Sequence, residues 1–128
     1  MNFNKYAKYA PFVIRLALAS VLLWFGISEL IDPITWASLV PPKAVHILNI
    51  SSETIMKISG SVEIILAVLL LVGAYTRIVA GIVILHLASI IWALGYGDLA
   101  VRDFGLFLAT ASLILSGAGA WSLDTEKV

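Results

Sequence analysis

Four long apolar runs dominate the sequence and limit what the chain can fold into. They cover Pro11 to Ile31, Glu53 or Thr54 to Gly73, Arg77 to Gly95, and Arg102 to about Trp121. Each run has roughly 18–21 residues, the length that an α-helix needs to cross the hydrocarbon core of a bilayer. Because a backbone in lipid must satisfy its own hydrogen bonds, the runs predict four transmembrane helices.

The composition agrees with a membrane protein. Hydrophobic residues make up 61% of the 128 residues and charged residues 12%. A soluble domain is about 45–50% apolar and about 25% charged, so this chain carries more apolar surface than its own core can bury. Lipid is the expected environment for that surface. We therefore predict an all-α, integral membrane four-helix bundle that forms one domain over residues 1–128.

Charge and cysteine content exclude several functions. Eight basic and eight acidic residues balance, and no basic face predicts a nucleic-acid partner. Cysteine is absent, which excludes thiol catalysis, disulfide exchange and cysteine-ligated iron–sulfur or zinc sites. The sequence contains no phosphate-binding loop, nucleophile–base pair or metal-ligand spacing, so we expect neither a metal nor an intrinsic cofactor.

The connections between the runs differ in length. The first, from Asp32 to Ser52, carries Pro33, Trp36 and several apolar residues, which predicts a short interfacial or re-entrant segment. The second, from Gly73 to Arg77, is so short that the helices on either side should form an antiparallel hairpin.

Lysine and arginine residues near the ends of the runs are divided unequally between the two sides of the membrane. One side holds five of them: Lys5, Lys8, Arg15, Arg77 and Lys127. The other side holds three: Lys43, Lys57 and Arg102. Since cytoplasmic ends of membrane helices are enriched in Lys and Arg, this excess predicts that both termini are cytoplasmic.

Two ionisable residues fall near the middle of the bilayer. At 1.5 Å per residue, Glu63 and His86 lie roughly 13–14 Å from the ends of their helices. A charge that faces lipid at this depth costs about 2.5–3.5 kcal/mol, so both side chains should face the bundle interior. We consider Glu63 and His86 the candidates for catalysis or proton exchange.

Further charged residues should line the same interior. Glu29, Lys57, Arg102 and Asp103 fall level with one another on the side away from the termini, and Arg15 shares a helical face with Glu29. We predict a polar pocket that is wide at this side and reaches down to Glu63. The candidate binding residues are Arg15, Glu29, Lys57, Arg102 and Asp103.

Three- and four-residue spacing predicts which face of each helix points inward. The interior stripes are Arg15, Ala19, Leu22, Gly26 and Glu29; Met56, Gly60, Glu63, Ala67 and Leu70; Ile82, His86, Ser89 and Ala93; and Asp103, Thr110, Gly117 and Asp124. A separate stripe in the last run consists of small residues, which are typical of helix packing surfaces: Gly105, Ala109, Ser112, Ser116 and Gly119.

Several of these residues also have other interpretations. Glu63 could belong to a buried ion pair, and His86 could be a proton relay, a haem ligand or a hydrogen-bonded core residue. Asp103 could simply favour the positive end of its helix while Arg102 reaches the lipid headgroups. Arg15 could pair with a carboxylate or mark the cytoplasmic boundary.

Several short motifs are shared with a known family. They are Arg15-Leu16-Ala17-Leu18-Ala19, Trp24-Phe25-Gly26-Ile27-Ser28-Glu29, Gly60-Ser61-Val62-Glu63, Leu69 to Arg77, Arg102-Asp103-Phe104-Gly105-Leu106, and Trp121-Ser122-Leu123-Asp124. Together they resemble the DoxX family of small four-helix membrane proteins from bacteria and archaea. The family-like positions are Arg15, Gly26, Glu63, Gly73, Arg77, Arg102 and Asp103, and the resemblance assigns a catalytic role to none of them.

The resemblance implies a multi-pass protein of the prokaryotic plasma membrane. Some relatives are membrane subunits of thiosulfate:quinone oxidoreductase, which implies a subunit of a quinone-linked redox system with a redox partner protein and quinone as its ligand. Two other functions stay open. The intramembrane charges could line the path of a carrier for protons or a small solute, which with four helices would need a homo-oligomer. They could also pair with a partner's helices in an assembly or scaffold protein.

Overall fold

The computed structural model describes residues 3–124, and its regular structure in that range is helical. The elements are a 3₁₀ helix η1 (Phe3–Tyr9), then α1 (Ala10–Ile31), α2 (Pro33–Ala37), α3 (Pro42–Leu48), α4 (Ser52–Val72), α5 (Thr76–Leu94) and α6 (Asp98–Ser116). Within the described residues, four helices are long and apolar enough to cross a membrane: α1 with its η1 extension, α4, α5 and α6. The predicted all-helical membrane fold is confirmed.

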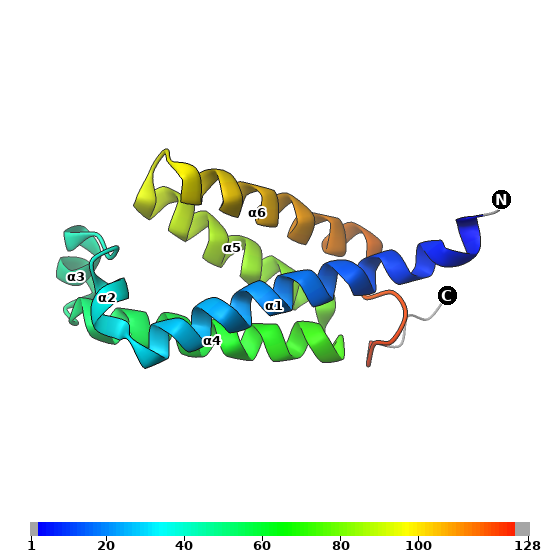
Figure 1. Cartoon of the computed structure of the whole chain (residues 1–128), viewed down its shortest axis with the longest axis horizontal. Helices are drawn as coiled ribbons and strands as arrows, with labels where there is room; N and C mark the ends of the chain where they lie inside the picture. Colours follow the sequence, from blue (N-terminus) through cyan, green and yellow to red (C-terminus); the bar gives the residue numbers. More distant parts are fainter. Residues whose placement is uncertain (1–2, 125–128) are drawn as a thin grey trace.

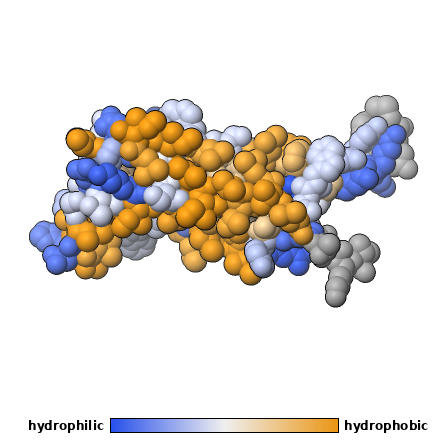
Figure 2. Space-filling model, turned by 90° about the horizontal axis from the view of Figure 1, so that it is seen from below, coloured by the Kyte–Doolittle hydropathy of each residue, from blue (hydrophilic) through white to orange (hydrophobic). Residues whose placement is uncertain are grey.

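The surface shows where lipid would lie. On the face shown in Figure 2, apolar side chains cover the middle of the molecule and hydrophilic residues gather toward its two ends. Large apolar side chains are strongly exposed, for example Leu85 at 72% and Leu115 at 83%. Exposed apolar surface on this scale is unfavourable in water and favourable in lipid. The chain is therefore a multi-pass membrane protein.

The four long helices are arranged as two pairs. Helix α1 packs along α4, and α5 packs along α6. The pairs lie close together at one end and diverge toward the other, where α2 and α3 connect α1 to α4 (Figure 1). Helix η1 and the segment after α6 both lie at the converging end. Lys127, which the orientation prediction counts, lies outside the described residues.

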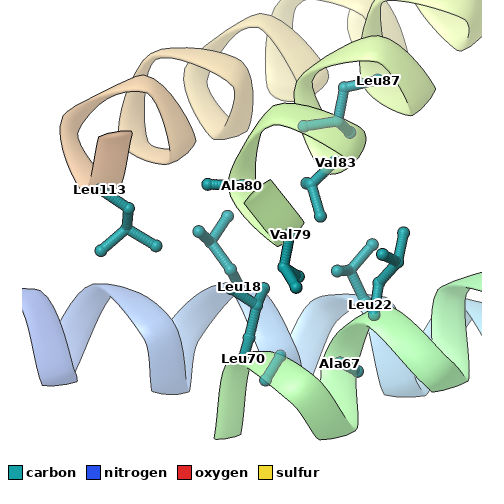
Figure 3. Packing of buried hydrophobic residues seen from close by; sticks show 11 residues of the cluster. Leu18, Leu22, Ala67, Leu70, Val79, Ala80, Val83, Leu87 and Leu113 are labelled. Carbon is teal, nitrogen blue, oxygen red and sulfur yellow. The ribbon is translucent and has the colours of Figure 1, made fainter. Parts of the chain in front are cut away.

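A hydrophobic core joins the two pairs at the converging end. Leu18 of α1, Leu70 of α4, Val83 of α5 and Leu113 of α6 point into the same space (Figure 3), and each is at most 2% exposed. Each helix thus turns one apolar stripe inward and leaves its other apolar faces to lipid. The core closes the space between the pairs on the side of the termini.

The contact between α1 and α4 depends on two glycines that face each other. A Cβ atom on Gly60 would lie 2.7 Å from the carbonyl oxygen of Gly26, and one on Gly26 would lie 2.7 Å from the carbonyl oxygen of Gly60. Only residues without a side chain allow the two backbones to approach this closely. The predicted interior stripes of α1 and α4 are correct, except that Met56 is only half-buried.

The predicted interior stripe of α5 is correct for three of its four residues. His86, Ser89 and Ala93 line the space between the helix pairs, whereas Ile82 is exposed and lies outside it. The fully buried residues of α5 are Thr76, Val79, Ala80, Val83 and Leu87, which pack into the core. The small-residue stripe of α6 is not a packing surface, because Gly105 and Ser116 are exposed.

Helix α6 spans different residues from those predicted. It begins at Asp98, so that Arg102 and Asp103 lie in its second turn, and it ends at Ser116. Gly117 and Gly119 then adopt left-handed φ angles of 76° and 68°, which glycine tolerates without steric cost. The chain then folds back across the converging end of the bundle. There the Ala120 N–H donates to the Lys8 carbonyl (2.9 Å) and the Leu123 N–H donates to the Val72 carbonyl (3.0 Å).

The connection between α1 and α4 forms the predicted short segment at the end of the bundle. Asp32 caps α2, since its carboxylate accepts hydrogen bonds from the Thr35 N–H (3.2 Å) and hydroxyl (2.6 Å). These two bonds lower the pKa of Asp32 below its ordinary value. The Trp36 ring packs edge-on against Phe25 of α1, with ring centroids 5.6 Å apart, and so fixes α2 beside the opening between the helix pairs.

A candidate site between the helix pairs

A cavity of about 820 Å³ occupies the space where the two helix pairs diverge. All four long helices contribute to its walls, and α2 and α3 border its opening. Most of the lining is apolar, including Phe25, Trp36 and Leu106. Its size and apolar walls are typical of sites that hold a small organic molecule. The polar groups described below are the exceptions in this lining.

Glu63 of α4 and His86 of α5 meet across the cavity. The Nε2 atom of His86 lies 2.7 Å from Oε1 of Glu63, and the two side chains are 16% and 4% exposed. Both residues line the cavity. The second oxygen of Glu63, Oε2, is buried and has no hydrogen-bond partner among the described residues. The pair is thus positioned to hold a proton at the wall of the cavity.

Glu29 of α1 lies beside this pair because of the glycine contact. A Cβ atom on Gly60 would lie 3.1 Å from Cβ of Glu29, and one on Gly26 would lie 3.1 Å from Cβ of Glu63. Each glutamate is therefore seated against the glycine of the opposite helix, close enough for the carboxyl groups to interact electrostatically. Glu29 is 7% exposed, and its Oε2 has no partner in the described chain.

Arg102 and Asp103 of α6 add two charged side chains to the lining. Nε and Nη2 of Arg102 donate to Oδ1 of Asp103 at 2.8 and 2.7 Å. The guanidinium also lies over the Phe25 ring of α1, 4.5 Å from its centroid. This cation–π contact links the two helix pairs across the cavity. Asp103 is 1% exposed, and its Oδ2 is unpartnered within residues 3–124.

Two of the predicted binding residues lie elsewhere. Lys57 is on the outer surface of α4, where its Nζ pairs with Glu53 at 2.9 Å. Arg15 is fully buried, but at the opposite end of the bundle. Its Nη1 donates to the Ala118 carbonyl (3.0 Å) and its Nη2 to the Trp121 carbonyl (2.6 Å). The interior position of Arg15 was predicted, but its role is to hold the segment after α6.

Asp124 holds the same segment after α6 in place, through contacts that the sequence analysis did not predict. Its carboxylate accepts hydrogen bonds from the Tyr75 N–H (2.6 Å) and the Thr76 N–H (2.7 Å), at the start of α5. Burial alone would raise the pKa of Asp124, but the hydrogen bonds from Thr76 and Tyr75 and the nearby Arg15 guanidinium lower it further than burial raises it. Asp124 was predicted to continue the α6 stripe, whereas it supplies the cap that α5 lacks locally.

The comparisons with known proteins identify the family. A family model described as DoxX matches residues 10–95, which is more than half of the chain. This chain belongs to the DoxX family. The matched residues include Glu29, Glu63 and His86 of the cavity. Helix α6, with Arg102 and Asp103, lies beyond the match. No curated protein and no solved structure matches this DoxX chain.

Proposed function

We propose that this DoxX protein is the membrane subunit of a quinone-linked redox system in the plasma membrane of a prokaryote, and that the cavity binds the quinone. The observation that carries the proposal is the placement of the hydrogen-bonded Glu63–His86 pair inside a large, mostly apolar cavity. A quinone combines a polar ring with an apolar tail, and this cavity offers a matching surface to each part.

The residues present fit such a ligand. The aromatic and aliphatic walls suit a flat ring and its tail, and the divergence of the helix pairs leaves the cavity open toward the surroundings. Glu29, Glu63 and His86 line the same cavity and give it a polar region that suits the ring.

The chemistry divides between the ligand, a partner and this chain. A bound quinone takes up two electrons and two protons and becomes a quinol. The electrons come from a redox cofactor on a partner protein. His86 and Glu63 hold a proton between Nε2 and Oε1 within reach of the cavity. Arg102, fixed by Asp103 and Phe25, orders the opening, and the core beyond Leu18 excludes water from the other side.

The closed end of the cavity favours this function over transport. The core of Leu18, Leu70, Val83 and Leu113 fills the space between the pairs on the side of the termini. A single chain in this conformation therefore offers no path across the membrane. A carrier for protons or solutes would need a homo-oligomer or a second conformation, and a scaffold would not need a cavity.

The test is quinone binding with a matched pair of variants. Ser59 and Ser61 both lie on α4, but Ser59 lines the cavity and Ser61 is exposed on the outer surface. We expect organic solvent to extract quinone from the purified wild type and from Ser61→Trp. A short-tailed quinone added to either protein should bind saturably. The tryptophan of Ser59→Trp should fill the cavity, so that this variant yields no extracted quinone and shows no saturable binding. No saturable binding to the wild type, or equal binding to all three proteins, would contradict the proposal.

A further inference from the structure

The charged groups that a ligand can reach at the cavity are cations. The Arg102 side chain is 40% exposed, and Lys43 is exposed where α3 borders the opening. The acidic residues of the lining, Glu29, Glu63 and Asp103, are instead buried in the wall. A ligand that arrives at the opening therefore meets two positive side chains, although the wall behind them holds three carboxyl groups.

Both cations have N–H groups left for a ligand. Nε and Nη2 of Arg102 donate to Asp103, which fixes the guanidinium at the opening. Its Nη1 and the Nζ of Lys43 have no hydrogen-bond or ion-pair partner among residues 3–124. Three further acidic residues at this end of the bundle do not line the cavity: Asp32, Glu53 and Asp98. Guanidinium and ammonium groups with free donors are the groups that bind phosphate in proteins.

The two cations lie at the depth of lipid headgroups. Arg102 follows the start of α6 at Asp98 by four residues, which places it about 6 Å from the end of that helix. Lys43 is on α3, at the same diverging end of the bundle (Figure 1). The ends of membrane helices lie near the headgroups, and basic pockets between such helices bind phospholipid headgroups.

The cavity also reaches the surface that faces lipid. Ile58 and Val62 of α4 and Trp92 of α5 line the cavity and are exposed as well. The walls farther inside are apolar and include Leu22 and Leu106. An acyl chain from the bilayer can therefore enter the cavity from the side while its headgroup stays at the opening. This continuity with the bilayer favours a lipid over a soluble phosphate compound.

We propose that the opening of the cavity is a binding site for an anionic phospholipid. Arg102 and Lys43 hold the phosphate, and an acyl chain extends into the apolar part of the cavity. A basic side chain near an anionic lipid strengthens binding by about fivefold. The proposal does not rest on quinone binding, and a lipid in this site would occupy the space proposed for the quinone.

The experiment measures the lipid selectivity of the purified full chain. Delipidated protein in detergent receives equal amounts of phosphatidylglycerol and phosphatidylcholine with the same acyl chains, and bound lipids are counted by native mass spectrometry. We expect phosphatidylglycerol to be preferred at least tenfold, because the choline group of the other lipid neutralises its phosphate. Glycerol phosphate, which has no acyl chain, should not displace the lipid. Equal binding of the two lipids would overturn the proposal. Displacement by glycerol phosphate at equal concentration would also overturn it, and would assign the opening to a soluble phosphate compound.

Variants test whether the two cations cause the preference. Lys43→Gln should lower it about fivefold. Lys57→Gln is the matched control, since Lys57 is exposed on the outer surface of α4, and it should keep the preference of the wild type. Arg102→Gln combined with Asp103→Asn removes the second cation without leaving a buried charge unpaired, and should act like Lys43→Gln. An unchanged preference in both cavity variants, or equal losses in Lys43→Gln and Lys57→Gln, would overturn the proposal.

Discussion

Replacing Gly60 by alanine tests how closely α1 and α4 must approach to form the site. The added Cβ would lie 2.7 Å from the Gly26 carbonyl oxygen, 3.1 Å from Cβ of Glu29 and 3.3 Å from Cγ of Leu30. The nearest atom belongs to the backbone of a buried helix and cannot turn aside. The two helices would have to separate, and overpacking of this kind costs about 1–3 kcal/mol.

The matched control is Gly81→Ala on α5, where an added Cβ meets no atom within 4 Å. In both variants the helix gains up to about 1 kcal/mol from the replacement of glycine by alanine. That gain cancels in the comparison and leaves the overpacking term. We therefore expect Gly60→Ala to be about 1–3 kcal/mol less stable than Gly81→Ala.

The assay is unfolding of the purified protein in mixed micelles with increasing SDS, followed by far-ultraviolet circular dichroism. Quinone binding should weaken in Gly60→Ala as well, because Glu29 and Glu63 are seated against the two glycines. Equal stability of Gly60→Ala and Gly81→Ala would refute the close contact of α1 and α4, and with it our explanation of how the two glutamates are positioned.

The contacts of Arg15 and Asp124 at the converging end of the bundle provide two further predictions. Arg15→Leu leaves the buried Ala118 carbonyl without its donor and should cost about 1–3 kcal/mol in the same assay. Arg77→Leu, an exposed control on α5, should cost almost nothing, and equal losses would refute the role of Arg15. Asp124→Ala removes the cap of α5 and should cost roughly 0.5–2 kcal/mol at neutral pH. Because the folded-state pKa of Asp124 is below its ordinary value of 3.8, the carboxylate stabilises the fold above pH 3.8, and this contribution is lost as the pH falls through the folded-state pKa. The difference in unfolding midpoint between wild type and Asp124→Ala should therefore shrink in acid, and a difference that is independent of pH would contradict this.

The architecture was predictable because hydrophobic length is a local property. Runs of about twenty apolar residues define membrane helices wherever they pack, and the predicted beginnings and ends of α1, α4 and α5 are correct to within about one or two residues. The end of α6 was not predictable in this way. The run stays apolar past Gly117, and only the backbone of that glycine, together with tertiary contacts of the last residues, stops the helix at Ser116.

The site was predictable in part, for a related reason. Depth follows from residue counting, so Glu63 and His86 could be placed at one level from the sequence, and the structure brings them to 2.7 Å. The rotation of a helix about its axis depends on its neighbours. That is why Ile82 was assigned to the interior face of α5 and why Lys57 was expected in the cavity. The link between Asp124 and the start of α5 joins residues about fifty positions apart, and no local pattern encodes it.

The most direct test of the central claim uses the absence of native cysteine. Ser59 and Ser61 are each replaced by cysteine in a separate variant. Each variant is then treated with a water-soluble maleimide, in intact membranes and in nanodiscs. The account predicts that Ser59→Cys is labelled through the open cavity and is protected by a short-tailed quinone, whereas Ser61→Cys, which faces lipid, is labelled slowly and is not protected. Equal labelling at the two positions, or labelling at Ser59→Cys that the quinone does not slow, would contradict a ligand-binding cavity between the helix pairs.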